Sequence, residues 1–344
     1  MSEKMKAVFT TEPGKSEVRE VPMPKMKDNC IMIKQKYVGV CMSEHYDWAN
    51  VGGRFGHEPM GVVCEVGKNV RGFEVGDRVS GLWGSGLPGA GGMVQYAVVN
   101  PKENTVIKLA DNVKDEDAVL EPLACLFSAV SKANIDMPNT KVCVVGCGYM
   151  GCGAISILKL RGAYVVAVDP KEACRKNALK YGADEVYDVD EALEKYGMAS
   201  IGKGVAGINS FEKQGFKVVM EWGETSESLN VAIELTRMLG QLCIGAYHTG
   251  PSRTINMQLA NVKAIDMLST HPRDMDRTAI GAKTAADMLA SGTWNFRDIP
   301  TMIYPINAFD KAHRELESKY GHHMKALINM EMEDGEPYLI NGEG

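Results

Sequence analysis

The stretch Val142-Cys-Val-Val-Gly146-Cys-Gly148-Tyr-Met-Gly151 decides the fold of the central part of the chain. It begins with a short apolar run, continues with glycines at G-x-G-x-x-G spacing, and leads into an apolar helical stretch. Gly146 permits a tight turn, Gly148 lets a pyrophosphate approach the backbone, and Gly151 allows the helix to pack closely on the strand. The order of strand, glycine turn and helix therefore predicts a dinucleotide-binding site.

The residues around this turn predict how the dinucleotide is held. Free N–H groups at the helix start, including those of Tyr149 and Met150, would hold the pyrophosphate together with the helix dipole. A second apolar strand ends at Asp169, whose carboxylate would accept hydrogen bonds from the adenosine ribose hydroxyls. A 2′-phosphate would meet like charge there, so NAD is favoured over NADP, although the nearby cations Lys171 and Arg175 weaken that preference. The alternative is a plain glycine turn with an ordinary aspartate at a strand end.

Strands and helices alternate around this motif, which predicts a parallel, doubly wound sheet. The expected strands are 142–145, 164–168, 185–188, 216–221 and 240–246, and the expected helices are 149–160, 173–181, 226–239 and 274–291. Residues 189–215 are ambiguous, and Gly202, Gly204 and Gly207 favour a loop there.

The rest of the chain is different in character. Short β-branched runs between glycines and prolines predict strands at 5–9, 30–40, 61–66, 77–80 and 93–99. A helix is expected over 117–134, broken early by Pro122, and residues 301–344 return to short strands around a helix at 308–320. That tail is too short to fold alone. We therefore expect an α/β protein with a β-rich catalytic domain (1–125 and 300–344) and a dinucleotide-binding domain (126–299).

Composition excludes several classes of protein. The chain has 344 residues and a net charge of −6 without a basic cluster, which disfavours nucleic acid and anionic membranes as partners. No apolar stretch approaches the ~20 residues of a membrane span, and the start, Met-Ser-Glu-Lys-Met-Lys, lacks the apolar core of a signal peptide. The odd number of nine cysteines and the lack of an export signal predict free thiols in a cytoplasmic location, and the lack of a C-x-x-C pair disfavours a zinc ribbon.

Three further segments carry metal-ligand chemistry: Gly39–His45, Gly56–Gly61 and Glu121–Cys125. They supply a thiolate, an imidazole and carboxylates, which are the ligand types of a catalytic zinc. Glu44 could orient the imidazole of His57, and the Ser43 hydroxyl could lie beside a metal-bound oxygen. Taken singly, Cys41 could instead be a buried structural thiol, His57 a core histidine and Glu121 a carboxylate at a helix start.

Together these segments resemble the zinc-dependent medium-chain dehydrogenase/reductase family. The resemblance runs from Lys6-Ala-Val to Lys325-Ala-Leu-Ile and rests on Gly56-His57-Glu58, Gly61-Val-Val-Cys-Glu-Val-Gly67 and Gly76-Asp77-Arg78-Val79. Glu121-Pro-Leu-Ala-Cys125 is similar to the polyol and threonine dehydrogenase branch. The resemblance implies a GroES-like catalytic domain and a Rossmann coenzyme domain, with zinc in the cleft between them.

The resemblance also implies roles for single residues. Cys41 and His57 would be zinc ligands, Glu58 a direct or exchangeable ligand, and Glu121 a direct or water-bridged ligand. Ser43 is similar to the first hydroxyl of the family's proton relay, and His45 stands one residue earlier than the relay histidine. Ser43, Glu58 and His45 are thus the candidate catalytic residues. The implied reaction is hydride transfer between NAD(H) and a small alcohol or carbonyl compound: a polyol, a secondary alcohol, or a hydroxy or amino acid.

The resemblance further implies a homodimer or homotetramer, for which the segment Arg253–Met257 is expected to supply an edge strand of the coenzyme domain.

Two departures from the family pattern carry expectations of their own. Residues 80–92 contain no cysteine where many relatives bind a structural zinc, so one catalytic zinc per subunit and no structural zinc is expected. The segment between His45 and His57 is short, which leaves the substrate open. The candidate pocket residues are Tyr46, Trp48, Arg54, Trp83 and Met93. Two alternative functions are a zinc-free enoyl or quinone reductase on the same fold and a non-catalytic NAD-binding sensor.

Overall fold

The computed structural model describes residues 4–51, 53, 55–84, 91–197, 215–318 and 323–342. The chain forms two compact units, one made of Met1–Ala124 with Ala279–Gly344 and the other of Cys125–Thr278. The chain passes between the units within helix α2 (Leu120–Val130) and again within helix α9 (Met275–Ser291). The second passage lies at 278/279, whereas the sequence analysis placed it at 299/300.

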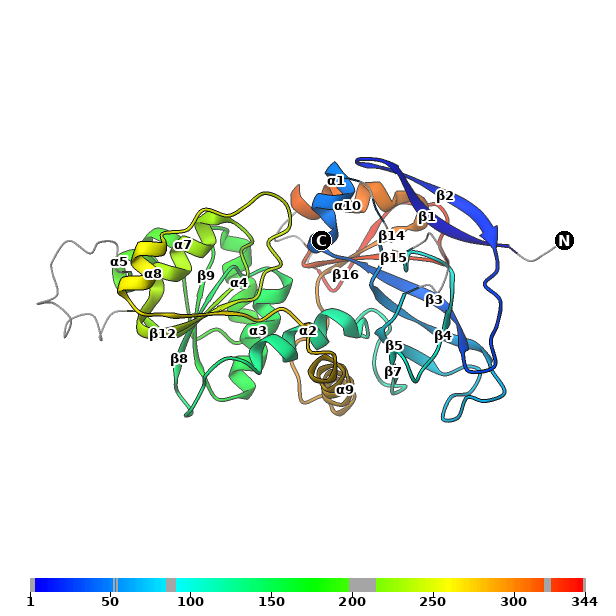
Figure 1. Ribbon diagram of the computed structural model, residues 1–344, viewed down its shortest axis with the longest axis horizontal. Helices are drawn as coiled ribbons and strands as arrows, with labels where there is room; N and C mark the ends of the chain where they lie inside the picture. The colour runs from blue at the N-terminus through cyan, green and yellow to red at the C-terminus, as the bar shows by residue number, and fades with distance from the viewer. Residues whose placement is uncertain are drawn as a thin grey trace, which may run out of the picture. The chain divides into compact units, whose positions relative to one another are not determined.

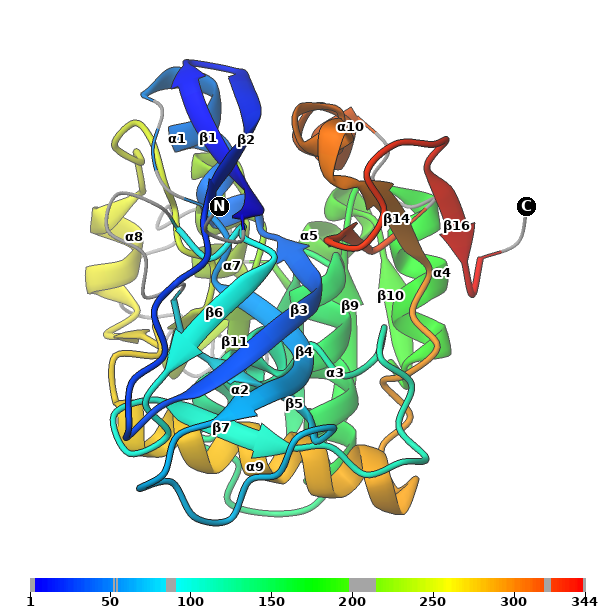
Figure 2. The same ribbon diagram turned by 90° about the vertical axis from the view of Figure 1, so that its right-hand side faces the viewer.

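Strand β3 (Ile31–Val40) is the centre of the first unit (Figure 2). It pairs antiparallel with β4 (Glu58–Val66), β6 (Tyr96–Val99) and β15 (Lys325–Asn329), and nearly all of its side chains are buried. The sheet continues from β4 through β5 (Arg78–Leu82) to β7 (Thr105–Lys108), and from β15 through β14 (Thr301–Pro305) to β16 (Tyr338–Ile340). Residues from both ends of the chain thus share one sheet. A separate hairpin joins β1 (Lys4–Glu12) to β2 (Lys15–Pro22).

The second unit contains a six-stranded sheet in the order β10-β9-β8-β11-β12-β13, with every pair parallel. Figure 1 shows strands of this sheet among the helices of the unit. Its strands are β8 (Lys141–Val145), β9 (Tyr164–Val168), β10 (Glu185–Tyr187), β11 (Phe216–Glu221), β12 (Thr236–Ile244) and β13 (Asp266–Ser269). Its helices are α3 (Tyr149–Leu160), α4 (Glu172–Lys180), α5 (Val189–Tyr196), α7 (Ser226–Leu235) and α8 (Met257–Val262). The apolar strands are buried as in other parallel sheets, which confirms the predicted doubly wound α/β class.

Two expected helix boundaries are wrong. Pro122 does not break its helix, because it stands in the first turn of α2, where the missing N–H would have no partner in any case. The helix expected over 226–239 ends at Leu235, and the β-branched Thr236 already has extended backbone angles and opens β12. The loop expected at Gly202, Gly204 and Gly207 lies outside the described residues.

The edge strand expected at Arg253–Met257 is also wrong, because the edge on that side of the sheet is β13. The Arg253 guanidinium donates to the carbonyls of Glu224, Thr249 and Pro251, which folds this segment against neighbouring loops. Asn256 then accepts a hydrogen bond from the backbone N–H of Leu259 and caps α8. A subunit contact through that side of the sheet would therefore involve β13.

A cluster of aromatic rings joins helix α1 (Met42–Asn50) to helix α10 (Phe309–Ser318) in the first unit. The ring of His313 stacks on Trp48 at 4.9 Å between centroids and lies 4.7 Å from Phe309 and 6.0 Å from His45. His313 is fully buried, and neither of its ring nitrogens has a hydrogen-bond partner. Burial, and then the neighbouring His45, lower its pKa to about 3. His313 therefore stays neutral in the folded chain.

None of the described helices is both long and apolar enough to span a bilayer.

The burial of His313 as a neutral ring predicts that acid destabilises the folded chain. Above the unfolded-state pKa of about 6.5, His313 is neutral in both states, so its protonation does not change the free energy of unfolding. As the pH falls below that value, the unfolded chain gains a proton that the folded chain refuses, so stability falls by up to about 1.4 kcal/mol per pH unit until the folded-state pKa is reached. We expect His313→Phe to keep or raise stability at pH 8 and to flatten the loss between pH 6.5 and 4 in urea unfolding. An unchanged pH slope would contradict this account.

Candidate metal and coenzyme site

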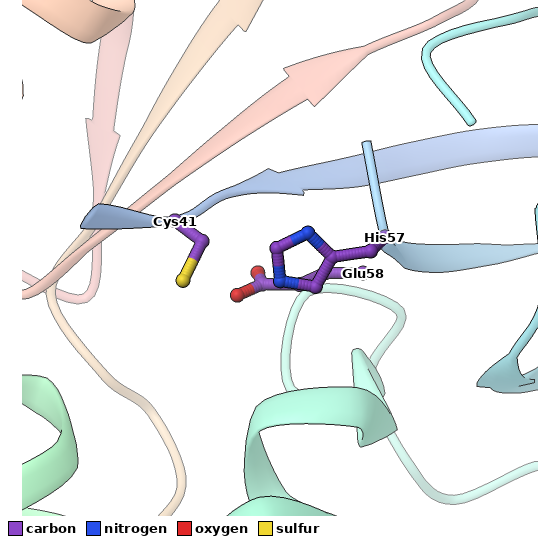
Figure 3. Close-up of side chains that lie close together, drawn as sticks. All are labelled: Cys41, His57 and Glu58. Atoms are coloured by element: carbon purple, nitrogen blue, oxygen red, sulfur yellow. The ribbon is translucent and has the colours of Figure 1, made fainter. Parts of the chain in front are cut away.

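The pairing of β3 with β4 brings three potential metal ligands together (Figure 3). Cys41 follows the last residue of β3, and Glu58 is the first residue of β4, directly after His57. One ligand atom from each of these three side chains lies within 4.8 Å of the other two. Gly39 stands opposite Glu58, and a Cβ there would lie 1.8 Å from Glu58 Oε2, so only glycine leaves room for this carboxylate. Within the described part of the chain, this is the one group of three that meets such a spacing.

The carboxylate of Glu44 orients the imidazole of His57. Its Nδ1 lies 2.6 Å from Oε1 of Glu44 in α1, which also accepts the backbone N–H of Gly56 at 2.9 Å. The carboxylate assigns the proton to Nδ1 and leaves Nε2 with a lone pair for a cation. Burial alone would lower the pKa of His57, but Cys41, Glu44 and Glu121 raise it to about 12. The acidic groups around His57 thus favour a positive charge, and the donor set fits a zinc ion.

The other predicted residues around this group are placed as follows. Glu121 lies in the first turn of α2, and its Oε2 is 4.0 Å from Nε2 of His57. The Ser43 hydroxyl donates to Sγ of Cys41 at 3.2 Å. His45, in contrast, packs its ring against Trp48 and His313, at 5.6 and 6.0 Å between centroids. The structure therefore gathers Glu121 and Ser43 at the three ligands and places the His45 ring in the aromatic cluster.

Sequence reasoning missed a buried cation at this site. Lys325, the first residue of β15, forms an ion pair through Nζ with Oε2 of Glu58, and the Glu58 side chain is only 1% exposed. Oε1 of Glu58 has no hydrogen-bond partner, which leaves it available to a bound cation. The sequence signal was a lysine that opens the otherwise apolar run Lys325-Ala-Leu-Ile. Only the pairing of β15 with β3 shows which group it meets.

The glycine turn of the second unit has the geometry of a phosphate-binding loop. Gly146 has a φ of +90°, and a Cβ there would lie 2.8 Å from the backbone nitrogen of Gly223. A Cβ on Gly151 would lie 1.9 Å from the carbonyl oxygen of Gly146, so the helix packs on the turn as closely as expected. Gly148 caps α3, and Tyr149 and Met150 are its first helical residues. The residues therefore fit a pyrophosphate at the start of this twelve-residue helix.

The Asp169 carboxylate has a structural role that the sequence did not indicate. It follows β9 and is 7% exposed. One oxygen accepts the backbone N–H of Cys147 and the other that of Lys171, both at 2.8 Å, so the carboxylate also fixes the glycine turn. Arg175 donates to the carbonyls of Asp169 and Pro170, which turns its guanidinium toward the backbone. A carboxylate offers about four lone-pair sites, so Asp169 can accept from a ribose hydroxyl in addition to these two N–H groups.

The expected pocket residues are mostly core residues. Trp48, Trp83 and Met93 are buried, and Trp83 donates from Nε1 to Oε1 of Gln35. Tyr46 is half-buried, and Arg54 lies outside the described residues.

Comparison with known proteins places this geometry in a family. The family described as alcohol dehydrogenase GroES-like domain matches residues 27–111, and the one described as zinc-binding dehydrogenase matches residues 150–281. Sorbitol dehydrogenase of Halalkalibacterium halodurans is 27% identical over 361 residues, covering 94% of this chain and 99% of that protein. L-threonine 3-dehydrogenase of Pyrococcus furiosus is 29% identical over 351 residues, covering 92% and 96%.

A solved structure from Sinorhizobium meliloti, bound to NADP, superposes with a TM-score of 0.75 at 21% identity over 95% of this chain and all of that one. This likeness confirms the fold expected from the resemblance. The two family matches and the nearly full-length relatives agree with the site geometry. The chain therefore belongs to the zinc-type medium-chain dehydrogenase/reductase family of alcohol and polyol oxidoreductases.

Proposed function

We propose that this protein is a zinc-dependent alcohol dehydrogenase that uses NAD and acts on a small polyol, secondary alcohol, or hydroxy or amino acid. The observation that carries the proposal is the convergence of Cys41, His57 and Glu58, with Glu44 behind the imidazole. The sorbitol and threonine dehydrogenases among its relatives support the substrate class. A zinc-free reductase would have no use for this set of converging ligand atoms.

The chain's own residues have distinct tasks in this proposal. Cys41 and His57 bind the metal, and Glu58 and Glu121 complete an exchangeable inner shell. Bound zinc would supply Lewis acidity and bound NAD a hydride acceptor. The Ser43 hydroxyl, which donates to the Cys41 sulfur in the unliganded chain, turns to accept the proton of the substrate hydroxyl. His45 remains the candidate for the next step of the relay.

Lys325 supports the proposal that Glu58 is an exchangeable ligand. A buried carboxylate needs a positive partner, and both Lys325 and a metal can meet that need. While Oε2 of Glu58 pairs with Lys325, Oε1 would be the oxygen available to the metal, so lysine and metal would compete for the charge of one carboxylate. Glu121, whose Oε2 lies 4.0 Å from Nε2 of His57, would be the other carboxylate of this exchangeable shell.

Metal analysis tests the proposed function. We expect a Zn:subunit ratio near one and NAD reduction that depends on an added alcohol from a panel of polyols and secondary alcohols. Cys41→Ser should lose zinc and most turnover, because a thiolate ligand is removed. Cys64→Ser is the matched control, since this exposed thiol lies away from the ligands, and it should keep both. Full activity without zinc would refute the mechanism, and a ratio near two would refute the expected lack of a structural zinc.

A double-mutant cycle tests the buried ion pair. We expect Lys325→Met to destabilise the metal-free protein by about 3 kcal/mol or more, because it leaves the Glu58 charge buried without a partner. The double variant Glu58→Gln/Lys325→Met should recover most of that loss. Urea unfolding with and without Zn²⁺ gives both values. Added Zn²⁺ should stabilise the Lys325→Met variant more than the wild type, and equal stabilisation would show that lysine and metal do not share Glu58.

Coenzyme choice tests the role of Asp169. One solved structure of this fold is bound to NADP and another to NADH, so we expect the side chains to decide between the coenzymes. We expect a higher kcat/KM with NAD, because a 2′-phosphate would meet the Asp169 charge. Asp169→Asn removes the charge and keeps one acceptor oxygen, for the N–H of either Cys147 or Lys171, and the ratio between the two coenzymes cancels a general weakening of the turn. It should shift the NADP:NAD ratio of kcat/KM upward by about tenfold. A wild-type preference for NADP would instead assign the decision to Lys171 or Arg175.

A further inference from the structure

A buried carboxylate ends strand β11 of the coenzyme unit. Glu221 is fully buried, and its Oε1 accepts three hydrogen bonds, from the backbone N–H groups of Gly223 and Glu224 and from the hydroxyl of Ser228 at the start of α7. The first oxygen of this carboxylate is therefore fully engaged by donors.

The second oxygen of Glu221 pairs with a histidine. Oε2 lies 2.9 Å from Nε2 of His248, in the irregular segment 245–256 that follows β12. An ionised carboxylate can only accept, so Nε2 carries the proton and Nδ1 presents a bare lone pair. The His248 side chain keeps 13% of its surface exposed, whereas Nδ1 is covered and has no hydrogen-bond partner. The backbone of His248 also has a φ of +55°, a conformation that side chains rarely adopt.

The pair lies beside the glycine turn. The backbone N–H of Trp222 donates to the carbonyl of Val145, the residue before Gly146, at 2.7 Å. In a doubly wound sheet, the dinucleotide crosses the carboxyl ends of the strands at the point where strand order reverses. Here that point lies between β8 and β11. Asp169 after β9 marks the adenosine side, so Glu221 and His248, at the ends of β11 and β12, border the nicotinamide side.

We propose that His248, oriented by Glu221, recognises the carboxamide of the nicotinamide ring. Nδ1 accepts a hydrogen bond from the carboxamide NH₂, and a shift of the segment after β12 uncovers this atom when the coenzyme binds. The inference rests on the proposed function only in that NAD is the coenzyme. It explains why a buried acceptor has no partner in the coenzyme-free chain. In this role, His248 would favour a coenzyme whose ring carries an amide over an analogue whose ring substituent cannot donate a hydrogen bond.

Binding of three ligands tests the recognition without reference to turnover. Titration calorimetry gives Kd for NAD, for its 3-acetylpyridine analogue, in which a methyl group replaces the NH₂, and for AMP. His248→Asn tolerates the left-handed backbone and removes the imidazole. It should weaken NAD by roughly three- to tenfold, the value of one hydrogen bond, and leave the analogue and AMP unchanged. Equal weakening of all three ligands, or none, would overturn the inference.

A second variant inverts the polarity of His248. In Glu221→Gln, the three donors hold the carbonyl oxygen at the Oε1 position, so the amide nitrogen must face Nε2 of His248. The imidazole then carries its proton on Nδ1 and becomes a donor. We expect this variant to strengthen nicotinic acid adenine dinucleotide, whose ring carboxylate accepts, relative to NAD, while AMP again reports an intact fold. An unchanged ratio of these two affinities would contradict the assignment.

The outcomes separate this inference from the proposed function. Wild-type protein that binds AMP but not NAD would refute the NAD-linked function itself. Wild-type protein that binds NAD with an affinity insensitive to His248→Asn would refute only the inference. Equal weakening of NAD and its acetylpyridine analogue with AMP spared would move the contact to the nicotinamide ribose and overturn the carboxamide assignment.

Discussion

The antiparallel pairing of β3 with β4 and β15 is the constraint on which the first unit depends. It places the end of β3, where Cys41 stands, beside the first residues of the two neighbouring strands, Glu58 and Lys325. A shift of one residue would turn every side chain to the opposite face of the sheet. The metal-ligand group is therefore a consequence of strand register, and the buried apolar residues of β3 that hold the register also hold the site.

The charges around Cys41, His57 and Glu58 explain why this group of side chains would bind a cation. The imidazole of His57 is surrounded by acidic groups: Glu44, Glu58, Glu121 and the Cys41 thiol. Among the described residues, the buried Lys325 supplies a compensating positive charge through its ion pair with Glu58. Such a group is stable only with further positive charge, from protons or from a metal. Cys41, Glu44 and Glu121 raise the pKa of His57 against the effect of burial, so a proton on this imidazole is the alternative to a metal. The same acidic groups that favour this proton would favour a bound cation.

In the second unit, carboxylates organise the loops at the ends of the strands. Asp169 bonds the backbone of the glycine turn, and Glu221 bonds the turn that leads into α7. Both are buried at the carboxyl edge of the parallel sheet, one on each side of the strand that carries the turn. Loops at this edge bind ligands in doubly wound folds because rigid strands hold them. Buried anions with backbone donors make those loops rigid here.

The sequence by itself determined the periodic and local features. The apolar run before Gly146, the glycine spacing and the alternation of strands and helices depend on steric rules that act within a few residues, so they predicted the parallel sheet and the phosphate-binding turn. The residue types of Cys41, His57 and Glu58 predicted the chemistry of a metal site. The helix expected over 226–239 and the edge strand expected at Arg253–Met257 were wrong, because the pairing of Thr236 with β11 and the hydrogen bond of Arg253 to the carbonyl of Glu224 depend on residues outside the local window.

Only the tertiary structure decided which buried charges meet. Lys325 is far along the chain from Glu58, and His248 is separated from Glu221 by a helix and a strand. A lone lysine or histidine in a sequence does not reveal its partner. A buried charge is stabilised by the oppositely charged or hydrogen-bonding group that the strand order places beside it. Strand order is a property of the whole sheet, so a local stretch of sequence does not reveal that group.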